Sequence, residues 1–154
     1  ETAMANVGYS YDSGFAGAKD MEEAVRWYTL AAEHGSVEAQ FNLGALYEGG
    51  EGVPQDYGIA YKWFEMAAGS GDPMAAMYLG LFHEEGLGRP VDPIEAYGWF
   101  FAAAEAGLPD AIAKRDEMQK LIAAESLVKA RALGERHLHE QAEGRERKRS
   151  EIKL

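Results

Sequence analysis

Apolar residues in the central part of the chain recur at helical spacing and are interrupted by turns rich in glycine. Between residues 38 and 48, one predicted helical face carries Ala39, Leu43, Gly44 and Tyr47. The pattern breaks at Gly50, and Asp56 is a candidate N-cap for a second helix that ends near Gly69. This stretch therefore predicts a helix–turn–helix unit.

The same unit occurs three times at one fixed interval. The tryptophans of the chain are Trp27, Trp63 and Trp99, and both differences, 63 − 27 and 99 − 63, equal 36. Other columns keep this interval, including Gly8, Gly44 and Gly80; Asp20, Asp56 and Asp92; and Ala31, Ala67 and Ala103. A fixed period of roughly 20 to 50 residues is typical of proteins built from stacked repeats.

The pattern predicts an all-α protein, a right-handed α-solenoid that forms one domain over 1–142. We expect helix pairs at about 1–37, 38–73 and 74–109, followed by a C-terminal capping helix pair over 110–142. Arg115 and Asp116 replace the leucine and glycine of the earlier units, so we expect a first capping helix over 111–122 and a second over 126–140. We expect the mixed-charge segment 143–154 to be a flexible tail.

Small residues in the repeat have a packing explanation. Gly44 and the alanine pair at 67 and 68 allow neighbouring helices to approach closely, while Trp63 and Phe64 fill the space between them. We therefore interpret the tryptophans as core residues that hold the stack together rather than as rings that stack on a ligand.

Composition narrows the possible functions. The net charge of −11 argues against binding of nucleic acid, which depends on Lys and Arg contacts to phosphates. The chain has no cysteine, which excludes disulfides, thiolate metal ligands and cysteine nucleophiles. No apolar run approaches the length of a membrane span, so we expect no direct membrane insertion. The chain begins at Glu1 rather than Met, and we interpret it as a fragment of a longer protein.

Three sequence strings carry a family resemblance. They are Ala-x-x-x-Leu-Gly-x-x-Tyr-x-x-Gly at 39–50, Gly-x-Gly-Val-Pro-x-Asp at 50–56 and Ala-x-x-Trp-Phe-x-x-Ala-Ala-x-x-Gly at 60–71. Over residues 3–109 the chain resembles the Sel-one-like repeat (SLR) family, relatives of the tetratricopeptide repeat. The resemblance implies an α-solenoid without catalytic activity or cofactors that binds other proteins, as an adaptor in bacterial signalling or in processes of the cell envelope.

In tetratricopeptide-like solenoids the first helix of each unit lines a concave groove, so positions that the repeat leaves free are candidates for partner binding. These positions describe an apolar strip with an acidic margin: Tyr9, Asp12, Phe41, Glu48, Met77, Leu81, Glu84 and Glu85. Such a strip suits a peptide or protein with apolar anchors and basic flanks. The alternative is that Phe41, Met77 and Leu81 simply pack against neighbouring helices.

Enzyme and metal sites receive little support. His137 and His139 are two residues apart, so on a helix they point in nearly opposite directions and cannot hold one ion; we interpret them as surface histidines. His83 occupies a column with Tyr11 and Tyr47, which favours packing or hydrogen bonding over catalysis. The Gly-x-Gly loops lack the Lys-Ser/Thr pair of a phosphate-binding loop.

Two hypotheses remain open. The chain is either a free adaptor that uses its groove, or the repeat region of a larger membrane-anchored regulator or localisation factor. Because many bacterial members of the family are exported, an exported or periplasmic location is favoured over the cytoplasm. The oligomeric state stays open, since an exposed first repeat with Tyr9, Tyr11 and Phe15 could pair with another copy.

Overall fold

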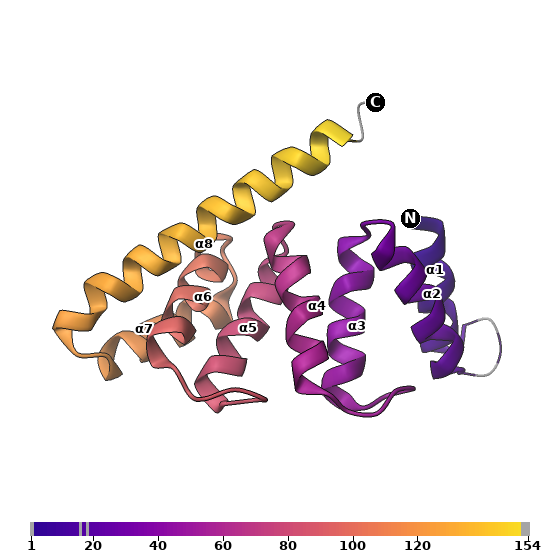
Figure 1. The fold of residues 1–154 in the computed structure, drawn as a ribbon, viewed down its shortest axis with the longest axis horizontal. Helices are drawn as coiled ribbons and strands as arrows, with labels where there is room; N and C mark the ends of the chain where they lie inside the picture. The colour runs from indigo at the N-terminus through magenta and orange to yellow at the C-terminus, as the bar shows by residue number, and fades with distance from the viewer. Residues whose placement is uncertain (1, 16, 18, 152–154) are drawn as a thin grey trace. The chain divides into compact units, whose positions relative to one another are not determined.

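A computed structural model describes residues 2–15, 17 and 19–151, and this part of the chain contains eight helices and no strand (Figure 1). The helices are α1 (Thr2–Ser13), α2 (Met21–Glu33), α3 (Val37–Gly49), α4 (Tyr57–Gly69), α5 (Pro73–Glu85), α6 (Pro93–Glu105), α7 (Pro109–Leu121) and α8 (Ala124–Glu151). The prediction of an all-α protein built from helix pairs is confirmed.

The chain forms two compact units, which we call unit 1 (Glu1–Ala67) and unit 2 (Ala68–Leu154). The boundary falls near the end of α4, so it does not coincide with a boundary of the sequence repeat.

In each repeat the glycine column lies against an aromatic ring of the following helix. A Cβ atom added at Gly8 would lie 2.8 Å from the Tyr28 ring, and one added at Gly80 would lie 2.5 Å from the Phe100 ring. Tyr28 and Phe100 are fully buried. The glycine is therefore required because its missing side chain leaves room for the ring that closes the helix pair.

The aspartate column starts the second helix of each repeat. The side chain of Asp20 accepts a hydrogen bond from the amide of Glu23, Asp56 accepts one from Ile59, and Asp92 accepts from both Ile94 and Glu95. The amides of a first turn have no partner within the helix, so these carboxylates satisfy donors that would otherwise depend on water. The prediction of an N-cap at Asp56 is confirmed, and Asp20 and Asp92 of the same column cap their helices in the same way.

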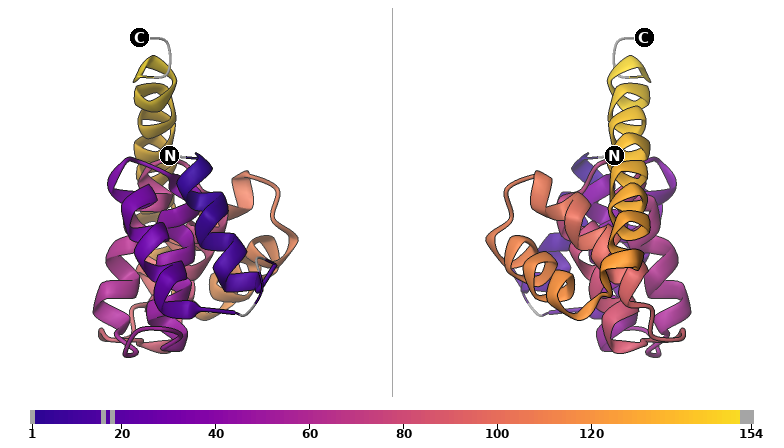
Figure 2. Two further views of the ribbon diagram at one scale, coloured as in Figure 1. Left: turned by 90° about the vertical axis from the view of Figure 1, so that its right-hand side faces the viewer. Right: turned by 90° about the vertical axis from the view of Figure 1, so that its left-hand side faces the viewer.

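Unit 1 has its core where α1, α2 and α3 meet. Helices α1 and α2 lie side by side (Figure 2), and α2 also contacts α3. The cluster of buried side chains includes Ala24, Tyr28 and Leu43, with Tyr47 and Trp63 packed against it.

Unit 2 is organised around α6, which contacts α5, α7 and α8. Its core cluster includes Tyr97, Phe100, Met118 and Ala130. Along this core α8 lies against α6 as a single helix of 28 residues (Figure 2).

Helix α8 corrects the expected end of the second capping helix. We expected that helix to end at residue 140, whereas α8 continues to Glu151 and makes residues 143–151 helical. Gly144 is buried against the turn after α4, where a Cβ atom would overlap the carbonyl oxygen of Gly69. The continuation therefore has a packing contact, and Gly144 allows a close approach instead of ending the helix.

The three tryptophans are not equally buried. Trp99 is 6% exposed, Trp63 is half-buried against the core of unit 1, and Trp27 is half-buried and lines an open hollow on α2. The interpretation of the tryptophans as core residues therefore fits Trp99 and Trp63 better than it fits Trp27.

Candidate functional site

In unit 1, the predicted residues of α1 differ in exposure. The side chain of Tyr9 is 59% exposed, whereas Asp12 is partly buried. Asp12 accepts a hydrogen bond from the Tyr28 hydroxyl at 3.5 Å, and its other carboxylate oxygen lies 3.8 Å from the Lys19 ammonium. Asp12 is thus already engaged with α2 and with the loop before it.

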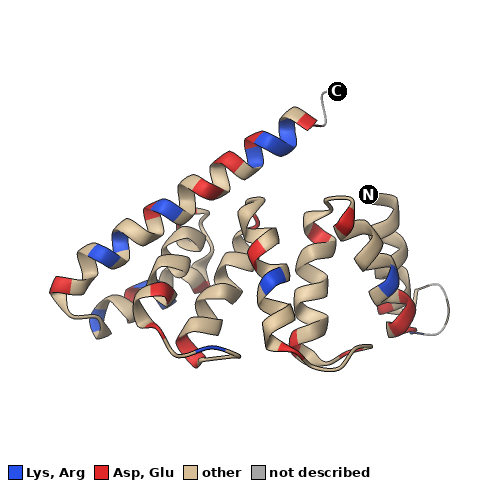
Figure 3. Cartoon of the chain, in the orientation of Figure 1, with Lys and Arg blue, Asp and Glu red and all other residues tan. Residues whose placement is uncertain are grey.

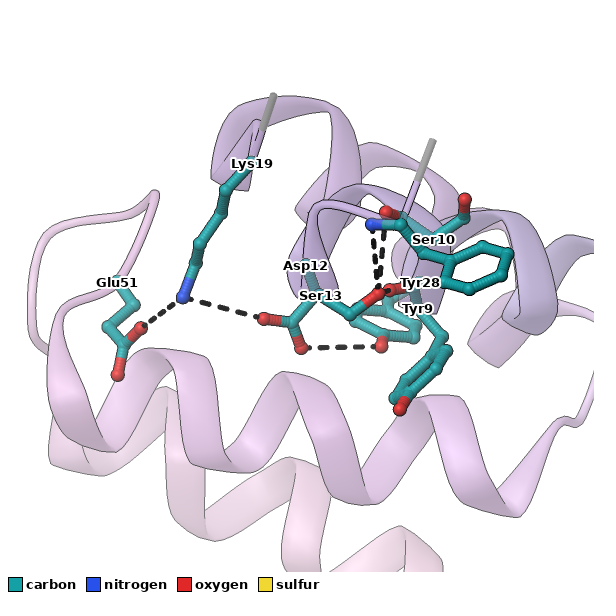
Figure 4. Close-up of polar contacts among 8 residues, drawn as sticks. Tyr9, Ser10, Asp12, Ser13, Lys19, Tyr28 and Glu51 are labelled. Carbon is teal, nitrogen blue, oxygen red and sulfur yellow. Dashed lines mark hydrogen bonds and ion pairs between the residues drawn. The ribbon is translucent and has the colours of Figure 1, made fainter. Parts of the chain in front are cut away.

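Lys19 connects two acidic residues of unit 1. Its ammonium lies 3.6 Å from the Glu51 carboxylate and 3.8 Å from Asp12, and Figure 4 draws both contacts as dashed lines.

Burial, reinforced by the negative charge of Asp12, raises the pKa of the Tyr28 hydroxyl above its ordinary value, so this hydroxyl remains a hydrogen-bond donor at neutral pH.

Helix α3 carries the next two predicted residues. The Phe41 ring packs against the Phe64 ring with centroids 5.6 Å apart and planes tilted by 54°. The backbone carbonyl of Glu48 accepts a hydrogen bond from the side-chain amide of Gln55 at 2.7 Å. Part of Phe41 therefore serves the repeat's own packing, which is the alternative that the sequence left open for this residue.

In unit 2, the two predicted apolar residues share one pocket. Met77 and Leu81 lie on α5 and line a cavity of about 250 Å³ that is completed by the start of α7. The other lining residues are Met74, Tyr78, Leu108, Pro109, Asp110 and Ala111. Both Met77 and Leu81 also pack against the core of unit 2, so only part of each side chain faces the pocket.

The acidic residues beside this pocket have different environments. Glu84 is paired with Lys114 of α7, whose ammonium lies 2.8 and 2.9 Å from its carboxylate oxygens. This hydrogen bonding raises the pKa of Lys114 above its ordinary value. Glu85 is exposed, as is Asp110 on the rim of the pocket. The negative charge available to a partner therefore comes from Glu85 and Asp110 more than from Glu84.

Sequence reasoning missed Lys114 and the α7 side of the pocket. The available signal was the repeat register, which places Ala111 in one column with Ala75 and thereby predicts that α7 follows α5 as a first helix. Lys114 itself shares a column with Asn42 and Tyr78, so the repeat did not predict a basic residue there.

His137 differs from its predicted role as a surface residue. It is 6% exposed, and its imidazole stacks on the Trp99 indole with centroids 3.7 Å apart and planes 11° apart. Burial lowers the pKa of His137 to about 4, with the positive charge of Arg136 acting in the same direction. His139, by contrast, is exposed. The surface prediction was wrong for His137 because its partner Trp99 lies on a distant part of the sequence.

His83 is buried in unit 2, and its Nε2 atom lies 3.4 Å from an Arg89 guanidinium nitrogen. Burial, followed by the charge of Arg89, lowers the pKa of His83 below its ordinary value. A packing or hydrogen-bonding role, as the sequence favoured, agrees with this placement. Across the residues that the structure describes, no three His, Asp or Glu side chains are grouped so that they could hold a metal ion.

Charge is distributed unevenly along the chain (Figure 3). Residues 1–67 contain Lys or Arg at three positions only, which are Lys19, Arg26 and Lys62. Most of the basic residues lie on α7 and α8. Within the described ranges, none of the helices combines the length and apolar character needed to cross a membrane.

Comparison with known proteins gives a consistent assignment. The sequence matches the family described as Sel1 repeat three times, at residues 2–36, 37–72 and 73–108. No curated protein matches the chain.

Two solved structures resemble the chain. One is c5321, described as a protective antigen present in uropathogenic Escherichia coli strains displaying an SLR fold, with 31% identity and a TM-score of 0.83 over 97% of this chain. The other is a Sel1 repeat protein from Oxalobacter formigenes, with 39% identity and a TM-score of 0.70 over 74% of this chain. The chain spans 32% of the first protein and 45% of the second. These matches confirm the prediction of an SLR-type α-solenoid.

Proposed function

Because the chain belongs to the Sel1 repeat family, whose members generally act as scaffolds for protein interactions, we propose that it binds a peptide or protein partner through the pocket between α5 and α7. Sel1 repeat proteins are typically non-catalytic, and the proposed role is binding alone.

The pocket lined by Met77 and Leu81 is the observation that carries this proposal. Its volume of about 250 Å³ suits one apolar side chain of a partner, and methionine side chains adapt to differently shaped ligands. Both residues belong to the free positions of a first helix, where the resemblance to tetratricopeptide-like proteins implied a groove. The pocket lies wholly within unit 2.

Charge around the pocket favours a partner with basic residues next to its apolar anchor. Asp110 is exposed on the rim of the pocket, Glu85 is exposed about one helical turn beyond Leu81, and the whole chain carries a net charge of −11. Opposite charges at the rim of an interface mainly accelerate association and select among partners. The corresponding positions of unit 1, Tyr9, Asp12, Phe41 and Glu48, stay predictions.

The biological setting is part of the proposal. Both similar structures come from bacteria, and one of them is described as a protective antigen. We place this chain in bacterial signalling or processes of the cell envelope on that basis. A free adaptor is the setting that we favour over the repeat region of a membrane-anchored regulator.

A peptide-display selection tests the proposal. A library of random peptides is selected against the whole chain, and the enriched peptides are measured against Leu81→Ala and Met74→Glu by fluorescence anisotropy. We expect peptides with one large apolar residue flanked by Lys or Arg, and a loss of affinity of about tenfold or more in both variants.

Met66→Glu is the matched control, because Met66 is 49% exposed and Met74 is 43% exposed, but Met66 lies on α4 and does not line the pocket. Peptides that bind the Met74 and Leu81 variants as tightly as the unsubstituted chain would contradict the proposal. Failure to enrich any peptide in repeated selections would contradict it as well.

A further inference from the structure

The outer face of α2 in unit 1 is hollowed and open. One cavity of about 460 Å³ lies along this helix and is lined by Glu23, Val25, Arg26, Trp27, Thr29, Leu30 and Glu33. Its centre is apolar, with Trp27 half-buried and Leu30 37% exposed. Its ends are charged, and the Arg26 side chain is 76% exposed and pairs with Glu23 on the same helix.

The equivalent face of α6 in unit 2 is covered by another helix. Trp99, in the same column as Trp27, stacks on His137 of α8. Gly134 of α8 lies beside Phe101, whereas His137, further along α8, lies 3.5 Å from Glu95. Residue numbers thus rise along α8 while they fall along α6, so this face of a second helix accepts a helix packed in the antiparallel direction.

The exposed face of α2 is complementary to itself in that direction. If a second copy of α2 lies antiparallel with its Leu30 opposite Trp27, then Arg26 comes near Glu33 of the second copy, and Glu23 comes near its His34. Arg26 and Glu33 are seven residues apart, about two helical turns, so they lie on the same side of α2 and can meet across a contact between two antiparallel copies. By twofold symmetry each of these pairs forms twice.

We propose that the chain self-associates through an antiparallel, twofold-symmetric contact between the α2 helices of two copies. Trp27 and Leu30 form its apolar centre, and Arg26 and Glu33 pair across it at both ends. The contact uses one helix from each copy and is small compared with stable interfaces, so we expect a weak dimer with a Kd on the order of 100 µM.

Sedimentation velocity over a range of concentrations tests the proposal on the whole chain. Arg26→Glu places two acidic residues opposite each other twice, and we expect it to weaken the dimer by about tenfold or more; Glu33→Arg should have a similar effect. The double variant Arg26→Glu/Glu33→Arg should restore dimerisation. Within one helix these two residues are separated by about 10 Å, so a rescue can arise only from pairing between copies.

Lys62→Glu is the matched control, because Lys62 occupies the same column on α4 and is exposed. It should leave the dimer unchanged. Far-UV circular dichroism confirms that each variant remains folded. A chain that stays monomeric up to about 1 mM, about ten times the expected Kd, overturns the proposal. So does a dimer that is insensitive to Arg26→Glu, or a double variant that is weaker than both single variants.

Discussion

The Phe64 ring lies directly against the backbone of Gly44, so close that a Cβ atom at Gly44 would lie 2.6 Å from it. Phe64 is fully buried, and the atoms that the added Cβ atom would meet belong to its rigid ring. The overlap therefore cannot be relieved by moving the end of a flexible side chain. This contact recurs with Tyr28 and Phe100 in the other repeats and closes each helix pair.

Gly44→Ala should therefore destabilise the chain although alanine favours helices. We expect a loss of about 1–3 kcal/mol in the free energy of unfolding, because the added methyl group forces the ring or the helix to move. Urea denaturation followed by circular dichroism measures this change. Gly69→Ala is the control: its Cβ atom would meet nothing within 4 Å, so a neutral or slightly stabilising effect is expected. Equal effects of the two substitutions would show that the ring contact is unimportant.

Stability should fall as the pH is lowered from about 6.5 to 4, in part because of His137. Burial lowers its pKa in the folded chain from 6.5 to about 4, so in this interval the unfolded chain binds a proton that the folded chain excludes. We expect His137 to contribute about 3 kcal/mol above pH 6.5 and to lose this contribution progressively towards pH 4. Thermal unfolding of the chain and of His137→Phe, which retains a stacking ring, measures the difference.

Two other titratable groups, Glu95 and His83, also contribute to the dependence of stability on pH. Burial raises the pKa of Glu95, so protonation of Glu95 at low pH favours the folded chain and opposes the effect of His137. His83, whose pKa is also lowered, acts in the same direction as His137. A Glu95→Gln background removes the opposing contribution, and His139→Ala is the exposed control. Identical pH profiles for the chain and His137→Phe would refute the prediction.

The ion pair between Glu84 and Lys114 should connect α5 with α7. The Glu84 side chain is 16% exposed and that of Lys114 is 33% exposed, so solvent screens the pair in part. We expect Glu84→Gln to cost about 1 kcal/mol and a double-mutant cycle with Lys114→Met to give a positive coupling energy. Glu85→Gln, next to it but exposed, should change stability by no more than about 0.5 kcal/mol. A coupling energy of zero would mean that the pair contributes nothing.

Gly144→Ala should loosen the last part of α8. A methyl group there would overlap the Gly69 carbonyl oxygen, so the helix must move away from the turn at residues 69–71. Hydrogen exchange measured by mass spectrometry should be faster at amides 142–151, with little change in 124–134. Glu143→Ala changes an exposed neighbour and should leave exchange as it is. Unchanged exchange in Gly144→Ala would argue against this contact.

Local signals explain why so much of the fold was predictable. Asp56 as a cap, Gly50 as a left-handed end of α3 and the glycine and aromatic columns all act within one repeat, so the periodic pattern contains them. Contacts between residues far apart in the sequence could not be predicted from this periodic pattern. His137 was taken for a surface residue because Trp99, which stacks on it, belongs to the third repeat, whereas His137 lies on α8, after the repeats.

The candidate site was predictable only in part for the same reason. The first-helix columns identified Met77 and Leu81, but the α7 side of their pocket lies where the repeat degenerates. Glu84 was expected to offer its charge to a partner, but the structure pairs it with Lys114, whose column holds Asn42 and Tyr78 in the earlier repeats and so does not predict a basic residue. Trp27 shows the opposite case, since its column predicted burial, whereas the face of α2 around it is open.

Asp116 has a consequence for how such an array can change its length in evolution. It stands in the column of Gly8, Gly44 and Gly80, where a side chain excludes the aromatic ring that closes a helix pair. A duplicated 36-residue segment inserted before Pro109 keeps the contact between the column glycine and the aromatic ring in the helix pairs on both sides. A segment inserted after α7 does not, because Asp116 stands in place of the glycine. We therefore expect whole repeats to be gained or lost before Pro109 rather than directly after α7.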